Sequence, residues 1–211
     1  MVDAIFVPQG AEERVVRRAL ARCGSPAVVY ITGLGCTAAA AAAERALEAA
    51  PAPRRVLISG LCGALTPSFA PGDLLLYAKM ESSGREVATD PELTAELQRA
   101  IPRALSGVRA VEVEEIVVRA SDKRVLALAT GAQAVDMESL TLAERFTRAG
   151  SAVAVLRAVS DGACDDIPDY NRALDGAGAM DSRTLAWVMA RNPIQAVRTM
   201  KRATRALRAL E

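Results

Sequence analysis

Short, continuously apolar runs alternate with amphipathic stretches along this chain, and this alternation constrains the fold more than any other feature. Residues 3–7, 56–59 and 152–159 are apolar almost throughout, which is typical of buried strands. A helical pattern covers residues 11–23 and ends at Gly24, a residue suited to a C-cap. Strands that alternate with helices predict an α/β fold with a mostly parallel sheet.

The length of 211 residues suits one domain and is short for two. We find no Ser/Gly linker, charge block or internal repeat, so we expect a single domain over residues 1–211. The predicted architecture is a three-layer α/β/α arrangement around a mixed, mostly parallel central sheet. The other predicted strands are residues 27–32, 74–77, 108–118 (one or two strands) and 134–137, and the other predicted helices are residues 37–50, 91–105, 121–130, 138–149, 171–189 and 193–210.

The composition excludes several classes of function. The chain contains no histidine, which removes Ser-His-Asp and Cys-His nucleophiles, histidine-ligated zinc and an imidazole base. Acid–base chemistry must therefore use carboxylates, Lys, Tyr or Cys. Lys plus Arg number 26 and Asp plus Glu 25, a net charge of +1 that argues against a dedicated nucleic-acid binder.

The cysteine pattern and the hydropathy bear on the compartment. The chain has four cysteines and no CxxC motif: Cys23, Cys36, Cys62 and Cys164. With no signal peptide recognised, we expect reduced thiols in a cytoplasmic protein and no metal site. No apolar run reaches the roughly 18–20 residues that a membrane span needs, so we expect no integral membrane segment.

Ligands of open α/β sheets bind at the carboxyl ends of the strands. The segments after the predicted strands are residues 9–13, 33–37, 60–65, 136–139 and 160–163. The Gly33-Leu34-Gly35 segment lacks the third glycine of a dinucleotide fingerprint, so a tight turn is as good an interpretation, and a Rossmann-type dinucleotide binder is the weakest hypothesis.

Carboxylates occupy three of these strand ends: Glu12 with Glu13, Asp136 with Glu138, and Asp161. Each has a structural alternative, since the glutamates suit a helix dipole and the aspartates suit caps or turns. Together they predict one cleft built for acid–base cleavage of a bond in a small ligand, as in glycoside hydrolysis by two carboxylates.

A second glycine-rich segment, Gly60-Leu61-Cys62-Gly63, follows a predicted strand, and we interpret it as a turn that lets backbone approach a flat ligand. Without a histidine to activate its thiol, Cys62 is better explained as a small buried residue than as a nucleophile.

Three segments together resemble the nucleoside phosphorylase and nucleosidase superfamily, which holds purine nucleoside phosphorylase and methylthioadenosine/S-adenosylhomocysteine nucleosidase. Residues 134–139 (AVDMES) resemble the family's VDME segment, and residues 157–163 (RAVSDGA) resemble its R-x-(I/V)-S-D-x-A segment. Residues 59–65 with the later Pro71-Gly72-Asp73 resemble its glycine turn and GD. The resemblance extends from the first strand to Asp161.

This resemblance implies roles for single residues. Asp161 would protonate N7 of a purine leaving group, with Ser160 orienting it. Glu138 would bind the ribose hydroxyls, and Met137 would pack on the sugar. Glu12 would activate the attacking water, with Glu13 as the alternative. The glycine segment would complete the substrate site: Gly60, Leu61, Cys62 and Gly63. No cofactor and no metal are implied.

The chain also departs from the family pattern. The phosphorylases place an arginine before the glycine turn and a Ser or Thr inside it, where this chain has Ile58 and Leu61. A site that lacks this guanidinium binds a phosphate anion poorly, so we favour hydrolysis over phosphorolysis. Phosphate is left open as a partner. Alternatives are a catalytically silent nucleoside- or adenine-binding homologue and a phosphorylase of a lipid-linked nucleoside, as in the hopanoid-associated subgroup. The family also implies a homo-oligomer.

The last predicted helix has an apolar stripe on one face and basic residues over much of the rest. The stripe consists of Ile194, Val197, Met200, Leu207 and Leu210. We expect it to dock the helix on the sheet, and contact of the basic residues with anionic lipid is the alternative.

Overall fold

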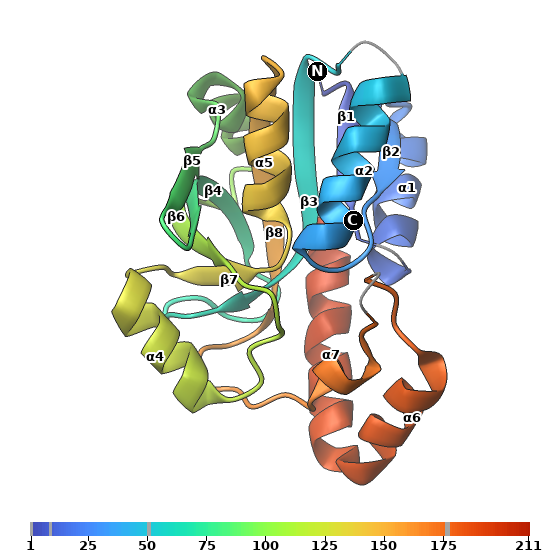
Figure 1. Cartoon of the computed structure of the whole chain (residues 1–211), viewed down its shortest axis with the longest axis vertical. Helices are drawn as coiled ribbons and strands as arrows, with labels where there is room; N and C mark the ends of the chain where they lie inside the picture. The colour runs from blue at the N-terminus through green and yellow to red at the C-terminus, as the bar shows by residue number, and fades with distance from the viewer. Residues whose placement is uncertain (1, 9, 50–51, 176–177) are drawn as a thin grey trace.

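The computed structural model describes residues 2–8, 10–49, 52–175 and 178–211 (Figure 1). The strands are β1 (Ala4–Val7), β2 (Val28–Ile31), β3 (Arg55–Ala64), β4 (Leu74–Ser82), β5 (Arg85–Ala88), β6 (Leu105–Glu112), β7 (Ala134–Asp136) and β8 (Ala152–Asp161). The helices are α1 (Ala11–Cys23), α2 (Cys36–Ala49), α3 (Pro91–Ala100), α4 (Ala120–Thr130), α5 (Ser139–Arg148), the 3₁₀ helix η1 (Tyr170–Ala173), α6 (Ser182–Arg191) and α7 (Pro193–Leu210).

The strands form one mixed sheet in the order β2-β1-β3-β7-β6-β4-β5, and β8 pairs with both β3 and β4. Within the described residues, five of the eight strand pairings are parallel and three are antiparallel, which confirms the predicted mixed, mostly parallel sheet. The pairings from β3 through β8, β4, β6 and β7 lead back to β3, so this part of the sheet closes on itself. The closure brings the ends of β3, β7 and β8 together.

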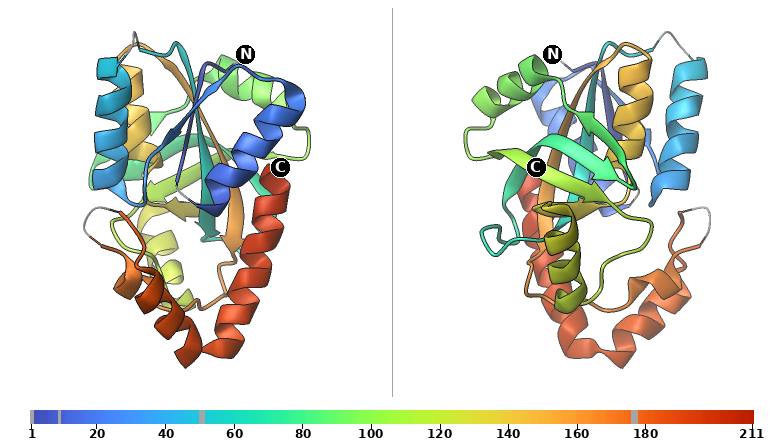
Figure 2. Two further views of the ribbon diagram at one scale, coloured as in Figure 1. Left: turned by 90° about the vertical axis from the view of Figure 1, so that its right-hand side faces the viewer. Right: turned by 60° about the vertical axis from the view of Figure 1, so that its left-hand side comes forward.

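Helices cover both faces of the sheet. Figure 2 shows α2 and α5 on one face, and α1, α3 and α7 on the other. Side chains of β1 alternate between the two cores, as period-2 geometry requires: Ala4 and Phe6 pack on the side of α2 and α5, whereas Ile5 and Val7 pack on the opposite side. The predicted three-layer arrangement is therefore confirmed.

The glycine-rich segment differs from its prediction. Residues 60–63 are not a turn, because β3 runs on through them to Ala64 and pairs with β8 and β7. Glycine inside a strand often marks a close approach of another group, and such approaches exist at Gly60 and Gly63.

Two other regions also differ from their predictions. Residues 171–189 are not one helix, since η1 ends at Ala173 and α6 begins only at Ser182, where Asp181 caps it by accepting from Thr184 N at 2.8 Å. Strand β5, which pairs with β4 through a tight turn, was not predicted from the sequence. The predicted helix end at residue 50 lies outside the described residues.

The expected docking of α7 through its apolar stripe is wrong for the first half of the helix. Ile194, Val197 and Met200 are 71%, 51% and 53% exposed. The residues that α7 buries are small or short: Ala196, Thr199 and Ala206. Small side chains let a helix backbone approach the sheet closely, which explains why they rather than the larger residues face inward. None of the described helices combines the length and apolarity needed to cross a membrane.

Candidate active site

A cavity of about 290 Å³ lies where β3, β7 and β8 end, and four of the predicted carboxylates line it: Glu12, Asp136, Glu138 and Asp161. Glu12 comes from the first turn of α1, Glu138 immediately precedes α5, and Asp161 is the last residue of β8. Most of the remaining wall is apolar and includes Leu61 and Met137. The structure thus brings acids from three distant parts of the sequence together in one largely apolar cavity.

Glu12 rather than Glu13 faces this cavity. Its Oε1 atom accepts a hydrogen bond from Leu61 N at 2.7 Å. Loss of solvation raises the pKa of Glu12 to about 7, although the Leu61 amide and nearby Arg157 oppose the shift. Glu13 forms an ion pair with Arg17 at 2.8 Å on the outer side of the helix. A carboxylate with a pKa near 7 can take a proton from water at neutral pH.

Glu138 is held by two partners from different parts of the chain. Its Oε1 accepts from Gly35 N at 2.9 Å, and its Oε2 lies 3.1 Å from Nη2 of Arg157. Burial raises the pKa of Glu138, whereas the charge of Arg157 lowers it. Glu138 and Arg157 are only 3% and 1% exposed. The carboxylate is therefore fixed in position beside the cavity.

Asp136 has the structural role that the sequence left open. Its Oδ1 accepts from the backbone N atoms of Glu138 and Ser139, at 3.1 and 2.9 Å, at the start of α5. Its Oδ2 lies 3.5 Å from Nε of Arg157. Burial disfavours the charge of Arg157, but the carboxylates of Asp136 and Glu138 outweigh this effect and raise its pKa, so Arg157 stays cationic.

Asp161 receives one side-chain donor on each oxygen. Ser160 Oγ donates to Oδ1 at 2.5 Å. Lys123 Nζ donates to Oδ2. The β3–β8 register pairs Cys62 with Val159 and Gly63 with Asp161, so Ser160 is the extra residue of a bulge. Bulges re-aim side chains next to active sites, and this one places Ser160 beside the carboxyl that it contacts.

The glycine-rich segment of β3 forms one wall. Leu61, Cys62 and Gly63 line the cavity, whereas Gly60 lies behind it, against Glu12 and Arg157. Burial raises the pKa of the Cys62 thiol to about 12, so this sulfur stays protonated and is no nucleophile at neutral pH.

Neither Lys123 nor Arg157 was predicted from the sequence to have a role in the site. A lysine in a short helix carries no local signal of burial, yet Lys123 is 1% exposed. Two acids of the loop after β8 are also held by partners, since Asp165 forms an ion pair with Arg202 at 2.6 Å and Asp166 accepts from Ala120 N at 2.8 Å.

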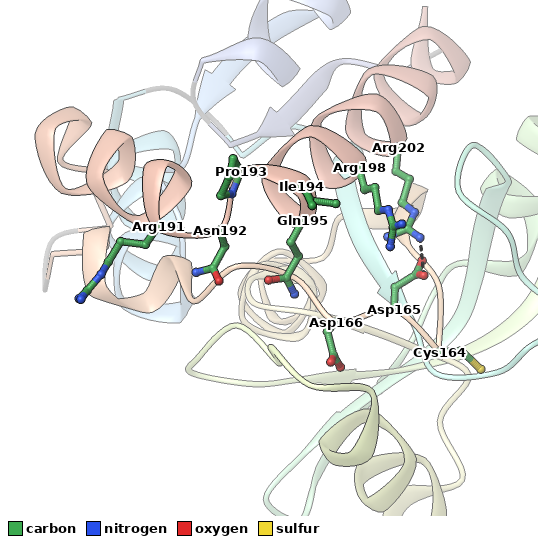
Figure 3. A pocket seen from close by; sticks show the side chains of 10 residues that line it. All are labelled: Cys164, Asp165, Asp166, Arg191, Asn192, Pro193, Ile194, Gln195, Arg198 and Arg202. Atoms are coloured by element: carbon green, nitrogen blue, oxygen red, sulfur yellow. Dashed lines mark ion pairs between the residues drawn. The ribbon is translucent and has the colours of Figure 1, made fainter.

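A larger cavity of about 630 Å³ lies between the 164–166 loop and the α6–α7 junction (Figure 3). The Asp165–Arg202 ion pair lies at its edge, and most of its lining side chains are exposed. None of Glu12, Glu138 and Asp161 lines it, so the smaller cavity is the candidate active site.

Comparison with known proteins agrees with this fold. The family model described as "Phosphorylase superfamily" matches residues 5–183. No curated protein matches the sequence. Among solved structures, a mutant of Helicobacter pylori methylthioadenosine/S-adenosylhomocysteine nucleosidase with 5′-methylthioadenosine in its active site has a TM-score of 0.70 at 16% identity, over 99% of this chain and 96% of that one.

Two further structures are similar over their whole lengths. Futalosine hydrolase of H. pylori has a TM-score of 0.67 at 16% identity, covering 100% of this chain and 96% of that one. The nucleosidase of Streptococcus pneumoniae in complex with 8-aminoadenine has a TM-score of 0.67 at 14% identity, covering 100% of both chains. At these identities the likeness shows a shared fold.

Proposed function

The chain belongs to the phosphorylase superfamily, and from this premise we propose that it hydrolyses the N-glycosidic bond of a purine nucleoside derivative. The observation that carries the proposal is the meeting of Glu12, Glu138 and Asp161 in one cavity. Neighbours of the same fold hold 5′-methylthioadenosine or 8-aminoadenine, which makes an adenine nucleoside the first candidate.

The leaving base is assigned to the Asp161 side of the cavity. Breaking the bond between C1′ and N9 moves an electron pair onto the purine, and a proton delivered to N7 by the Asp161 carboxyl neutralises it. The Ser160 hydroxyl, 2.5 Å from Oδ1, fixes the orientation of that carboxyl. General acid help of this kind accelerates reactions by about 10²–10⁴-fold.

The sugar is assigned to Glu138 and Met137. A carboxylate held by Gly35 N and Arg157 accepts hydrogen bonds from the ribose hydroxyls and stabilises positive charge that develops at C1′. Met137 lines the cavity beside it and offers an apolar surface to the ring.

The nucleophile is a water activated by Glu12. With its pKa raised to about 7 by burial, Glu12 accepts a proton as the water oxygen bonds to C1′. The Leu61 amide holds the carboxylate at the cavity wall. The products are the free purine and the free sugar.

The charge of the site favours water over phosphate. Among the described residues that line the cavity there is no Lys or Arg. Arg157, the nearest guanidinium behind it, is already engaged by Glu138, Ser139 and the Leu61 carbonyl. A phosphate dianion beside Glu12 would meet like charge without a free cationic partner.

The test is release of free base from adenosine, inosine and methylthioadenosine, each with and without phosphate. We expect release that does not depend on phosphate and yields the free sugar. A strict phosphate requirement with a sugar 1-phosphate product would overturn the choice of water. Tight adenine binding with no release from any nucleoside would instead show a silent binding homologue.

A further inference from the structure

Lys123 lies behind the proposed general acid and makes three contacts that use all its donors. Its Nζ atom donates to Asp161 Oδ2, to Gly162 O at 2.9 Å and to Asp165 O at 3.0 Å. It is the only residue of α4 that is buried, and it does not line the cavity. We propose that Lys123 is a positioning residue that stores the proton which Asp161 delivers to the leaving base; this inference rests on the proposed function.

The contacts of Lys123 suit a proton that moves. An ammonium offers three N–H donors, one each to Asp161, Gly162 and Asp165. After the proton between Nζ and Oδ2 has moved to the carboxyl, the neutral amine keeps two donors for the two carbonyls. Its lone pair then accepts from the new O–H group. Every hydrogen bond survives the transfer, so the pair holds its proton on either atom without leaving a buried group unsatisfied.

Contacts between α4 and the loop after β8 fix the position of Lys123 relative to Asp161. Asp166 Oδ1 accepts from Ala120 N at the start of α4, which ties the helix to the loop after β8. Asp165 Oδ2 accepts from Gly162 N at 2.8 Å, and its Oδ1 pairs with Arg202 of α7 (Figure 3). These contacts fix both carbonyl acceptors of Lys123, so the ammonium has one geometry available.

The proposed step balances. As the bond between C1′ and N9 breaks, its electron pair goes to the purine, and N7 takes the proton of the Asp161 carboxyl. Lys123 supplies that proton to the carboxylate and becomes a neutral amine. The attacking water loses a proton to Glu12, which releases it to solvent, and solvent returns a proton to Lys123, so the enzyme regains its starting state. No oxidant, reductant or further reactant is needed.

Two substitutions separate proton storage from charge. Lys123→Met removes the charge and the proton and keeps the length of the side chain. Lys123→Arg keeps the charge but cannot release a proton in a protein. Lys201→Met on the exposed side of α7 is the matched control. The substrates are methylthioadenosine, whose base needs a proton, and 4-nitrophenyl β-ribofuranoside, whose phenolate leaves without one.

We expect both Lys123 variants to lose about 10²–10⁴-fold in kcat on methylthioadenosine, the range of general acid catalysis. On the nitrophenyl riboside they should lose less than about threefold, because that leaving group needs no acid. The high-pH limb of kcat on methylthioadenosine should move to lower pH. The ratio of kcat on methylthioadenosine to kcat on the nitrophenyl riboside does not depend on the folded fraction of a variant.

Three results would overturn the inference: equal losses on both substrates, an unmoved high-pH limb, or wild-type kcat in Lys123→Arg. Asp161→Asn, measured alongside, separates this inference from the proposed function. If Asp161→Asn loses purine turnover while the Lys123 variants keep it, only the role of Lys123 fails. If Asp161→Asn keeps wild-type turnover, the proposed function itself fails.

Discussion

Replacing Gly60 by alanine tests how closely the glycine segment is packed against the site. Gly60 has a φ of +149°, which L side chains rarely adopt. A Cβ atom there would lie 2.6 Å from Nη1 of Arg157, 2.8 Å from Oε1 of Glu12 and 3.0 Å from Cδ of Pro8. The two polar neighbours are held by other hydrogen bonds, so neither can move away freely.

The expected cost has two parts. Backbone strain at a residue held in a rare region costs about 1–3 kcal/mol. Forcing extra volume into a packed interior costs about 1–3 kcal/mol more. We therefore expect Gly60→Ala to lower the free energy of unfolding by about 4 kcal/mol. For a chain of this size, about 2–4 °C is lost per kcal/mol, so Tm should fall by about 8–16 °C.

The matched control is Gly84→Ala, in the turn between β4 and β5. Gly84 has a φ of +79°, and nothing lies within 4 Å of the position of its Cβ. Alanine at position 84 should therefore introduce backbone strain but no steric clash. Urea unfolding of both variants should show a loss at Gly60 that exceeds the loss at Gly84 by about 2 kcal/mol. Equal losses would refute the close approach of Gly60 to Glu12 and Arg157.

Three other predictions follow from the charges of the site. With a Glu12 pKa of about 7, kcat/KM should fall at pH 6 to about a tenth of its plateau at higher pH, because protonated Glu12 cannot act as the base. Glu12→Gln should abolish this low-pH decrease, and an unchanged decrease in that variant would exclude Glu12 as the base. Arg157→Met leaves the buried carboxylates of Asp136 and Glu138 unpaired, so it should lower the free energy of unfolding in urea by about 3–5 kcal/mol. The exposed control Arg208→Met should lower it by less than about 0.5 kcal/mol. Similar urea midpoints for the two variants would argue against the ion pairs of Arg157 with these carboxylates. Glu138→Gln should lower kcat/KM for ribosides more than for 2′-deoxyribosides, and equal losses would contradict the sugar contact.

Local patterns predicted the elements whose residues decide their own structure. The apolar run at residues 3–7 forms β1 from Ala4 to Val7, and the helix Ala11–Cys23, which depends on periodicity and a glycine cap, forms where expected. The end of β8 was also predictable as a site, because a carboxylate comes at the end of a strongly apolar run. Asp161 accordingly lies at the cavity.

Other features depend on contacts between distant residues, which local patterns do not encode. The local sequence around Gly60 predicts a turn, whereas the structure shows that Arg157 and Glu12 closely approach this glycine within a strand. The burial of Lys123 depends on carbonyls of the loop after β8, about 40 residues further along the chain. Ile194 was expected inside, but the close packing of α7 on the sheet selects its small residues instead.

The most direct test of the central claim is the rate of free base release from methylthioadenosine by the wild type, Asp161→Asn and Asp169→Asn. Asp169 is an aspartate with a 45% exposed side chain, paired with Arg172 outside the candidate site, so its variant is the matched control. We predict release by the wild type and the control, and a loss of about 10²–10⁴-fold in Asp161→Asn. Equal rates in all three proteins would contradict the assignment of Asp161 as the proton donor.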